Sequence, residues 1–169
     1  IADDNGVLAI GGIMGGEETG CTEETTNVFL EVALFDPIRT ATTGRKLGIE
    51  SDARYRFERG LDPESANWGA EAATKLILEF CGGEASELTA AGEMPKWARP
   101  VSLRLTRLKS FGGVDVESDE AVDILTRLGF KPKVEGGVIR GTTPSWRADV
   151  ESENCIVEEV LRVRGFDEI

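Results

Sequence analysis

The chain has 169 residues, a size that fits one large domain or two small ones. Its 40% hydrophobic and 30% charged residues are typical of a globular protein and exclude an intrinsically disordered one. The formal net charge of −12 argues against nonspecific nucleic-acid binding by the whole surface, and no apolar run reaches the roughly 20 residues of a membrane-spanning helix.

The composition also excludes several kinds of catalytic site. The chain has no histidine, which removes the commonest general base at neutral pH and the commonest zinc ligand. Its three cysteines, Cys21, Cys81 and Cys155, are too widely spaced for a CxxC pair or a disulfide framework. Together with the lack of a signal-peptide pattern, this cysteine usage predicts a reducing, cytoplasmic setting.

The first part of the chain predicts two strands and two helices. The apolar runs Val7–Met14 and Val28–Phe35 are both typical of buried strands. Asp-Pro pairs at 36–37 and 62–63 are typical helix starts, which predicts one helix to about Leu47 and a longer one to about Phe80.

The second part predicts a separate α+β domain after a linker. Residues 83–100 are rich in Gly, Ala, Glu and Pro, so we place a linker at 95–100, between domains 1–94 and 101–169. The pattern predicts a strand at 101–105, short helices starting at Thr106 and Ser118, a hairpin around Glu135-Gly136-Gly137, and a final helix over 151–164. Helices followed by a small hairpin suggest a winged-helix-like α+β domain.

Charge is distributed unevenly along the chain. Residues 1–38 hold eight acidic and no basic side chains, whereas residues 39–60 hold six basic and three acidic ones. This basic segment is either a solvated surface with local ion pairs or a contact for an anion such as a tRNA phosphate.

Two acidic features are candidate binding sites. Glu31 is the one charge in an apolar run, so it either faces solvent, pairs with an arginine of 39–59, or accepts a hydrogen bond from a ligand hydroxyl in a pocket. The last helix and its approach carry Asp149, Glu158 and Glu159, which form either a solvated acidic face or a site for a hard cation such as Mg²⁺. Glu158 and Arg162, four residues apart, predict a surface ion pair.

Four blocks of sequence resemble one known family in their order and spacing. They are GGIMGG at 11–16, VFLEVALFDP at 28–37, GRKLGIESDARYRFERGLDP at 44–63 and PSWRADVESENCIVEEVLRVRGFDEI at 144–169. The set closely resembles the bacterial phenylalanyl-tRNA synthetase beta subunit. The resemblance implies an internal fragment: the later half of a mixed α/β editing domain, followed by the small winged-helix-like domain.

The resemblance also implies roles for particular residues. In that family the alpha subunit charges tRNA(Phe) in an ATP-dependent reaction, and the beta subunit hydrolyses misacylated tyrosyl-tRNA. Glu31 matches the carboxylate that recognises the tyrosine hydroxyl, Ala53 the small residue at the base of the editing pocket, and Gly12 and Gly15 its glycine wall. No catalytic nucleophile is implied, and the fragment alone is expected to be inactive.

A metal and several partners are implied as well. Asp149, Glu158 and Glu159 match a magnesium motif shared with the alpha subunit, in which Cys155 replaces an expected Asp. The implied partners are the alpha subunit, in an alpha2-beta2 heterotetramer, and tRNA(Phe), with no membrane. Two other functions stay open: a non-catalytic structural or tRNA-docking module, and a DNA-binding winged helix. The thin basic surface of residues 101–169 argues against the second.

Overall fold

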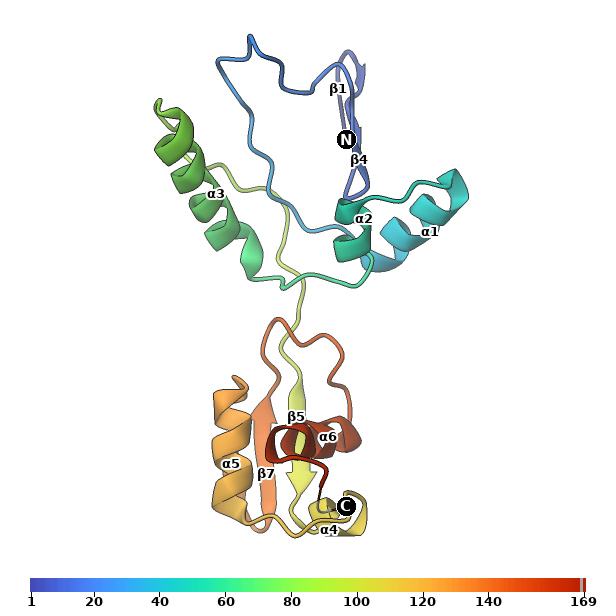
Figure 1. The fold of residues 1–169 in the computed structure, drawn as a ribbon, viewed down its shortest axis with the longest axis vertical. Coiled ribbons are helices and arrows are strands. Elements are labelled where there is room, and N and C mark those ends of the chain that lie inside the picture. Colours follow the sequence, from blue (N-terminus) through green and yellow to red (C-terminus); the bar gives the residue numbers. More distant parts are fainter. Residues whose placement is uncertain (168) are drawn as a thin grey trace. The chain divides into compact units, whose positions relative to one another are not determined.

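The computed structural model of the chain describes residues 1–167 and 169. These residues form a mixed α+β structure with small antiparallel sheets and six helices (Figure 1). They divide into two compact units, Ile1–Met94 and Pro95–Ile169. Within the described residues, no helix is both long and apolar enough to cross a membrane.

The first unit starts with two short hairpins. Strand β1 (Ala2–Asp3) pairs with β2 (Gly6–Val7), and β3 (Ala9–Ile10) pairs with β4 (Met14–Gly15). The prediction of one strand over Val7–Met14 is therefore wrong. The chain reverses direction at Gly11–Ile13, where Gly12 has a φ of 68°, a left-handed conformation that glycine adopts without strain.

The predicted strand over Val28–Phe35 is also wrong, because this segment has no regular secondary structure. A strand needs a neighbour to receive its backbone hydrogen bonds, and among the described residues no strand pairs with this segment. Its apolar side chains consequently stay in contact with solvent, and Phe29 is 95% exposed.

Three helices complete the first unit: α1 (Pro37–Leu47), α2 (Asp52–Phe57) and α3 (Ser65–Cys81). The Asp36 carboxylate caps α1 as predicted, accepting a hydrogen bond from the Arg39 amide at 2.7 Å. Gly48 ends α1 in a left-handed conformation. Helix α2 was not predicted, although Ser51 is a favourable N-cap residue and its hydroxyl accepts a hydrogen bond from the Arg54 amide.

The second unit is built on a three-stranded antiparallel sheet with strand order β5-β7-β6. Its strands are β5 (Pro100–Arg104), β6 (Lys133–Glu135) and β7 (Val138–Thr142). The predicted hairpin is confirmed, since β6 and β7 pair directly across Gly136 and Gly137. Both glycines have positive φ angles, which a two-residue hairpin turn of this type requires.

Three helices pack with this sheet: α4 (Thr106–Ser110), α5 (Ser118–Arg127) and α6 (Glu153–Arg164). Thr106 and Ser118 are the first residues of their helices, not the predicted side-chain caps. Helix α6 contacts both β5 and α5, as Figure 1 shows. One continuous core results, whose fully buried members include Leu103, Leu108, Leu125, Ile156, Val157 and Val160.

Candidate functional site

The glycine-rich turn of the first unit is packed on an aromatic pair. A Cβ on Gly11 would lie 2.6 Å from the Phe35 ring, and a Cβ on Gly12 would lie 2.9 Å from it, so larger residues at both positions would collide with that ring. Phe35 in turn packs edge-to-face on Phe57 of α2, with ring centroids 5.1 Å apart. The turn, the end of the 28–35 segment and α2 therefore meet at Phe35.

A hydrogen bond joins the same turn to the start of α2. The Ser51 hydroxyl donates to the backbone carbonyl of Ile13, the buried residue of the turn, and accepts from the Arg54 amide at 3.1 Å. One hydroxyl thus caps α2 and fixes it beside the turn. Ala53 follows Ser51 by two residues and is exposed.

The four residues predicted to form the editing pocket are brought together only in part. Gly12 lies in the turn on Phe35, and Ala53 lies on the helix that Ser51 holds beside this turn. Gly15 lies in β4, where a Cβ would meet open space. Glu31 is exposed and outside any strand, and no hydrogen bond or ion pair engages it within the described part of the chain. Their role in a pocket stays a prediction.

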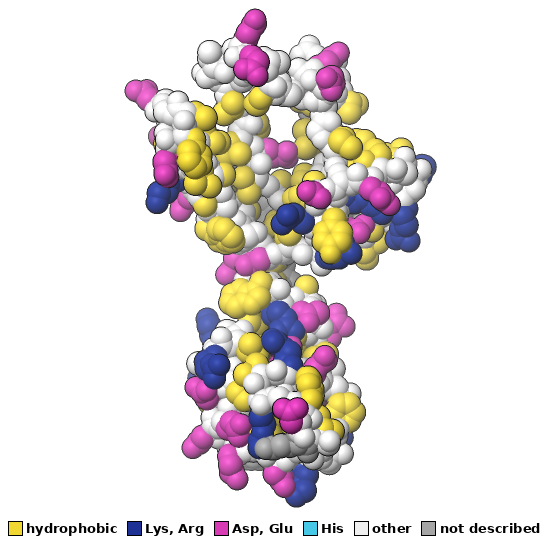
Figure 2. Space-filling model, in the orientation of Figure 1, with side chains coloured by type: hydrophobic (Ala, Val, Ile, Leu, Met, Phe, Trp, Pro, Cys, Tyr) yellow, Lys and Arg dark blue, Asp and Glu magenta, His cyan; other side chains and the backbone are white. Residues whose placement is uncertain are grey.

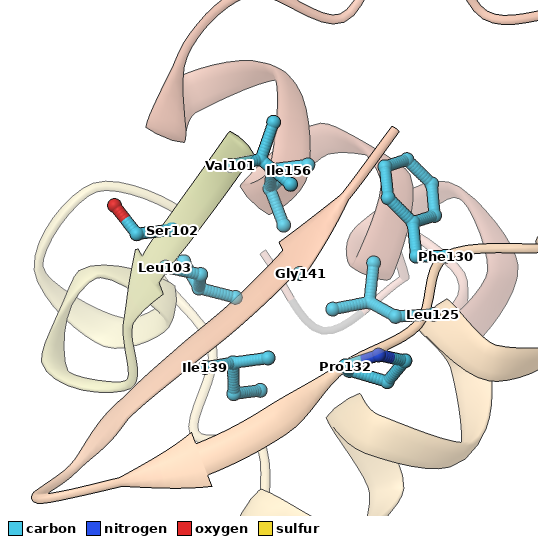
Figure 3. A pocket seen from close by; sticks show the side chains of 9 residues that line it. All are labelled: Val101, Ser102, Leu103, Leu125, Phe130, Pro132, Ile139, Gly141 and Ile156. Atoms are coloured by element: carbon cyan, nitrogen blue, oxygen red, sulfur yellow. The ribbon is translucent and has the colours of Figure 1, made fainter. Parts of the chain in front are cut away.

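A small cavity occurs in the second unit, but its size excludes a ligand. It lies between the sheet and helices α5 and α6, and its lining includes Leu103, Leu125, Phe130, Ile139 and Ile156 (Figure 3). Its volume of about 10 Å³ approaches the space that one water molecule needs, and its lining is almost entirely apolar. It is a packing gap of the core.

The strongest electrostatic feature of the second unit is centred on Glu159 of α6. This residue is 4% exposed, although its side chain is a carboxylate. The Arg147 guanidinium donates to its two oxygens at 2.6 and 2.9 Å, and Arg162 donates to both oxygens as well. Arg147 also donates to Asp149 through two hydrogen bonds, at 2.8 and 2.7 Å. We call these four residues the arginine–carboxylate cluster.

The cluster keeps its carboxylates ionised. Burial raises the pKa of Glu159, but the hydrogen bonds from Arg147 and Arg162 outweigh burial and lower this pKa to about 2. The hydrogen bonds from Arg147 hold the pKa of Asp149 below its usual value. The pKa of Arg147 is raised by the same contacts. Two carboxylates and two guanidinium groups therefore balance each other at neutral pH.

Sequence reasoning missed Arg147 and assigned Arg162 to the wrong partner. Arg162 pairs with Glu159, three residues away, and the described contacts contain no ion pair between Arg162 and Glu158. A signal was available, because Glu159 follows the buried Ile156 by three residues and so falls on the apolar face of α6. A carboxylate on such a face needs cationic partners to remain charged.

The predicted magnesium ligands do not fit a cation site as they are arranged here. Arg147 already occupies the oxygens of both Asp149 and Glu159, whereas Glu158 is exposed. Cys155 lies 3.2 Å from the Ser152 hydroxyl and offers a thiol, a poor magnesium ligand. Among the described residues, no group of three or more His, Cys, Asp or Glu side chains is placed to hold a metal ion. Magnesium binding stays a prediction of the resemblance.

Titration of the 169-residue chain with MgCl₂ is expected to show no saturable binding below the millimolar range. Mg²⁺ gives up its water molecules reluctantly and requires near-octahedral oxygen ligands, which Asp149 and Glu159 could supply only by leaving Arg147. Isothermal titration calorimetry measures this binding, with CaCl₂ as a comparison cation. Tight magnesium binding would contradict the expectation and would mean that the cluster opens to receive the ion.

Comparisons with known proteins match parts of the chain to two domain families. Residues 1–82 match the B3/4 domain family, and residues 101–166 match the tRNA synthetase B5 domain family. The chain is 56% identical to the phenylalanine–tRNA ligase beta subunit of Rhodospirillum rubrum over 99% of its length, and 53% identical to that of Brucella abortus over its whole length. It spans 21% of each relative. The chain therefore belongs to the family of bacterial phenylalanyl-tRNA synthetase beta subunits, as the segment that holds the B3/4 and B5 domains.

Proposed function

We propose that the chain contributes one wall of an editing pocket that removes tyrosine esterified in error to tRNA(Phe). The convergence of three segments at Phe35 is the observation that carries this proposal. These segments are the glycine turn, which holds Gly12, the end of the 28–35 run, which follows Glu31, and α2, which holds Ala53. The first unit is then the later half of the editing domain.

The proposed reaction is hydrolysis of an aminoacyl ester. A water oxygen bonds to the ester carbonyl carbon, the bond from that carbon to the ribose oxygen breaks, and the ribose oxygen takes a proton from the water. Tyrosine and deacylated tRNA leave. The chain contains no histidine to activate a nucleophile, which favours catalysis through positioning of substrate and water.

The second unit has a supporting role in this proposal. The β6–β7 hairpin follows α5 along the chain, an arrangement that supports a winged-helix-like module. We infer that this module, joined to the first unit through residues 95–100, helps hold the beta subunit against an alpha subunit that charges tRNA(Phe) with ATP. An alpha2-beta2 assembly in the cytoplasm would bring this module and the alpha subunit together.

One observation favours a second candidate function, a structural or tRNA-docking module without chemistry. Glu31 is exposed, and it makes no hydrogen bond or ion pair within the described part of the chain. In this candidate the first unit only positions the tRNA. The two candidates differ in what removal of the Glu31 carboxylate does to editing.

In the full-length enzyme, Glu31→Ala is expected to slow tyrosyl-tRNA(Phe) hydrolysis roughly 10- to 100-fold, the effect of losing one hydrogen bond to a charged group. The reason is that the carboxylate would no longer accept the hydrogen bond of the tyrosine hydroxyl. Deacylation of purified tyrosyl-tRNA(Phe) measures the rate, and phenylalanine activation should stay unchanged. Glu71→Ala, which removes an exposed carboxylate from α3, is the matched control. If Glu31→Ala edits at the control rate, the second candidate is favoured.

A further inference from the structure

The helices α1 and α2, with the turn that follows α2, carry an exposed basic surface in which most charges have no described carboxylate partner. Helix α1 has three basic side chains and no acidic one, and α1 packs against α2. The exposed members of this surface, which we call the α1–α2 basic surface, are Arg39, Arg45, Lys46, Arg56 and Arg59. Figure 2 shows dark blue side chains over this part of the first unit, with magenta carboxylate side chains among them.

Most of these cations have no carboxylate partner among the described residues. Arg59 pairs with Glu58 at 3.1 Å, but no described ion pair involves Arg39, Arg45, Lys46 or Arg56. In the second unit, by contrast, every arginine has a carboxylate within ion-pair distance: Arg99, Arg104, Arg107, Arg127, Arg140, Arg147, Arg162 and Arg164. The second unit therefore pairs all of its arginines, whereas α1 and α2 leave four exposed cations without a described ion pair.

An aromatic platform lies within this surface. The Arg59 guanidinium stacks over the Tyr55 ring at 3.6 Å from its centroid, although Tyr55 is 60% exposed. An exposed aromatic ring beside cationic groups is a typical arrangement for contact with RNA, because bases stack on the ring while cations neutralise phosphates.

The position of the basic surface relative to the glycine turn suggests which anion it meets. The Ser51 hydrogen bond and the Phe35–Phe57 contact fix α2 beside that turn. A tRNA whose 3′ end reached the proposed pocket would place its acceptor strand next to α1 and α2. The acidic residues 1–38 would repel the same strand, which restricts its approach to the basic side.

We propose that the α1–α2 basic surface binds the phosphate backbone of the tRNA acceptor end during editing. Arg39 and Lys46 are seven residues apart on α1, about 10 Å along the helix axis, so one helix can contact more than one phosphate. This inference rests on the proposed editing function, because that function brings the acceptor end to α2. It adds a defined contact surface outside the pocket.

The test compares two triple variants of the full-length enzyme with the same change in charge. Arg39→Gln, Arg45→Gln and Lys46→Gln are combined in one variant. The control combines Lys75→Gln, Lys131→Gln and Lys133→Gln, which are exposed lysines outside the surface. The dissociation constant for deacylated tRNA(Phe) is measured at several salt concentrations, and circular dichroism verifies the fold of both variants.

The surface variant is expected to bind tRNA(Phe) roughly 10-fold more weakly than the control near 0.1 M salt, because phosphate contacts dominate RNA affinity. The slope of its log affinity against log salt concentration should be smaller in magnitude by about 2. Each lost phosphate contact accounts for about 0.7 of this slope, and the variant loses three contacts. Equal affinity and equal slope in the two variants would overturn the proposal.

The experiments distinguish failure of the basic-surface proposal from failure of the pocket proposal. If Glu31→Ala edits normally while the surface variant loses tRNA affinity, the pocket assignment fails and the basic surface stands. If Glu31→Ala loses editing while the surface variant binds like the control, the pocket stands and the basic surface fails.

Discussion

Ala53→Trp in the full-length enzyme is expected to abolish hydrolysis of tyrosyl-tRNA(Phe). Ala53 lies near the start of α2, two residues after the serine that is bonded to the glycine turn. An indole at this position would fill space that the tyrosyl group needs in the proposed pocket. Deacylation assays should show no hydrolysis above the spontaneous rate, with phenylalanine activation preserved.

The fold of the first unit should tolerate this substitution. Large residues placed in a packed core cost about 1–3 kcal/mol, but Ala53 is exposed in this chain. Ala72→Trp, the same change at an exposed position of α3, is the matched control and should edit normally. Thermal unfolding followed by circular dichroism should give similar midpoints for both variants. Normal editing by a folded Ala53→Trp enzyme would show that Ala53 does not line the pocket.

Arg147→Met is expected to destabilise the second unit by about 3 kcal/mol, the lower end of the cost of breaking a buried ion pair. The variant leaves Glu159, which is 4% exposed, with Arg162 as its remaining cationic partner in the cluster. Asp149 also loses its two hydrogen bonds, although it is exposed and can be hydrated. Urea unfolding of the 169-residue chain, followed by circular dichroism, measures the loss.

Two further variants identify the cause of this loss. Arg127→Met breaks the exposed pair with Asp123 at 3.4 Å, which should cost less than about 1 kcal/mol. Combining Arg147→Met with Glu159→Leu removes the buried charge as well, so it should recover part of the stability that Arg147→Met loses. Equal stability of Arg147→Met and Arg127→Met would show that the cluster contributes little to folding.

The arginine–carboxylate cluster also bears on how the magnesium motif is interpreted. The resemblance assigns Asp149 and Glu159 to a cation, and in this chain the cation beside both is the Arg147 guanidinium. A guanidinium supplies directed hydrogen bonds to two carboxylates at once, and it thereby occupies the oxygens that a magnesium ion would need as ligands. Motif residues can therefore match a family while their side chains already have other partners.

Features that depend on neighbouring residues were predictable from the sequence by itself. The Asp36 cap of α1, its end at Gly48 and the hairpin turn at Gly136–Gly137 are all stabilised by contacts within a few residues. The order of the four sequence blocks was also sufficient to identify the family, since each block is a local pattern and their succession is specific.

Features that depend on distant residues were decided by the tertiary structure. An apolar run such as 28–35 becomes a strand only when another strand receives its hydrogen bonds, and none of the described strands does so. The contact of Phe35 with the glycine turn joins residues more than 20 positions apart, and the bond from Ser51 to Ile13 spans 38 positions. Arg147 reaches Glu159 only because α6 directs the Glu159 carboxylate toward the loop that precedes this helix. The sequence determined which side chains were available for such contacts, and the packing of elements determined which of them met, because partners in space are set by the whole fold and not by spacing along the chain.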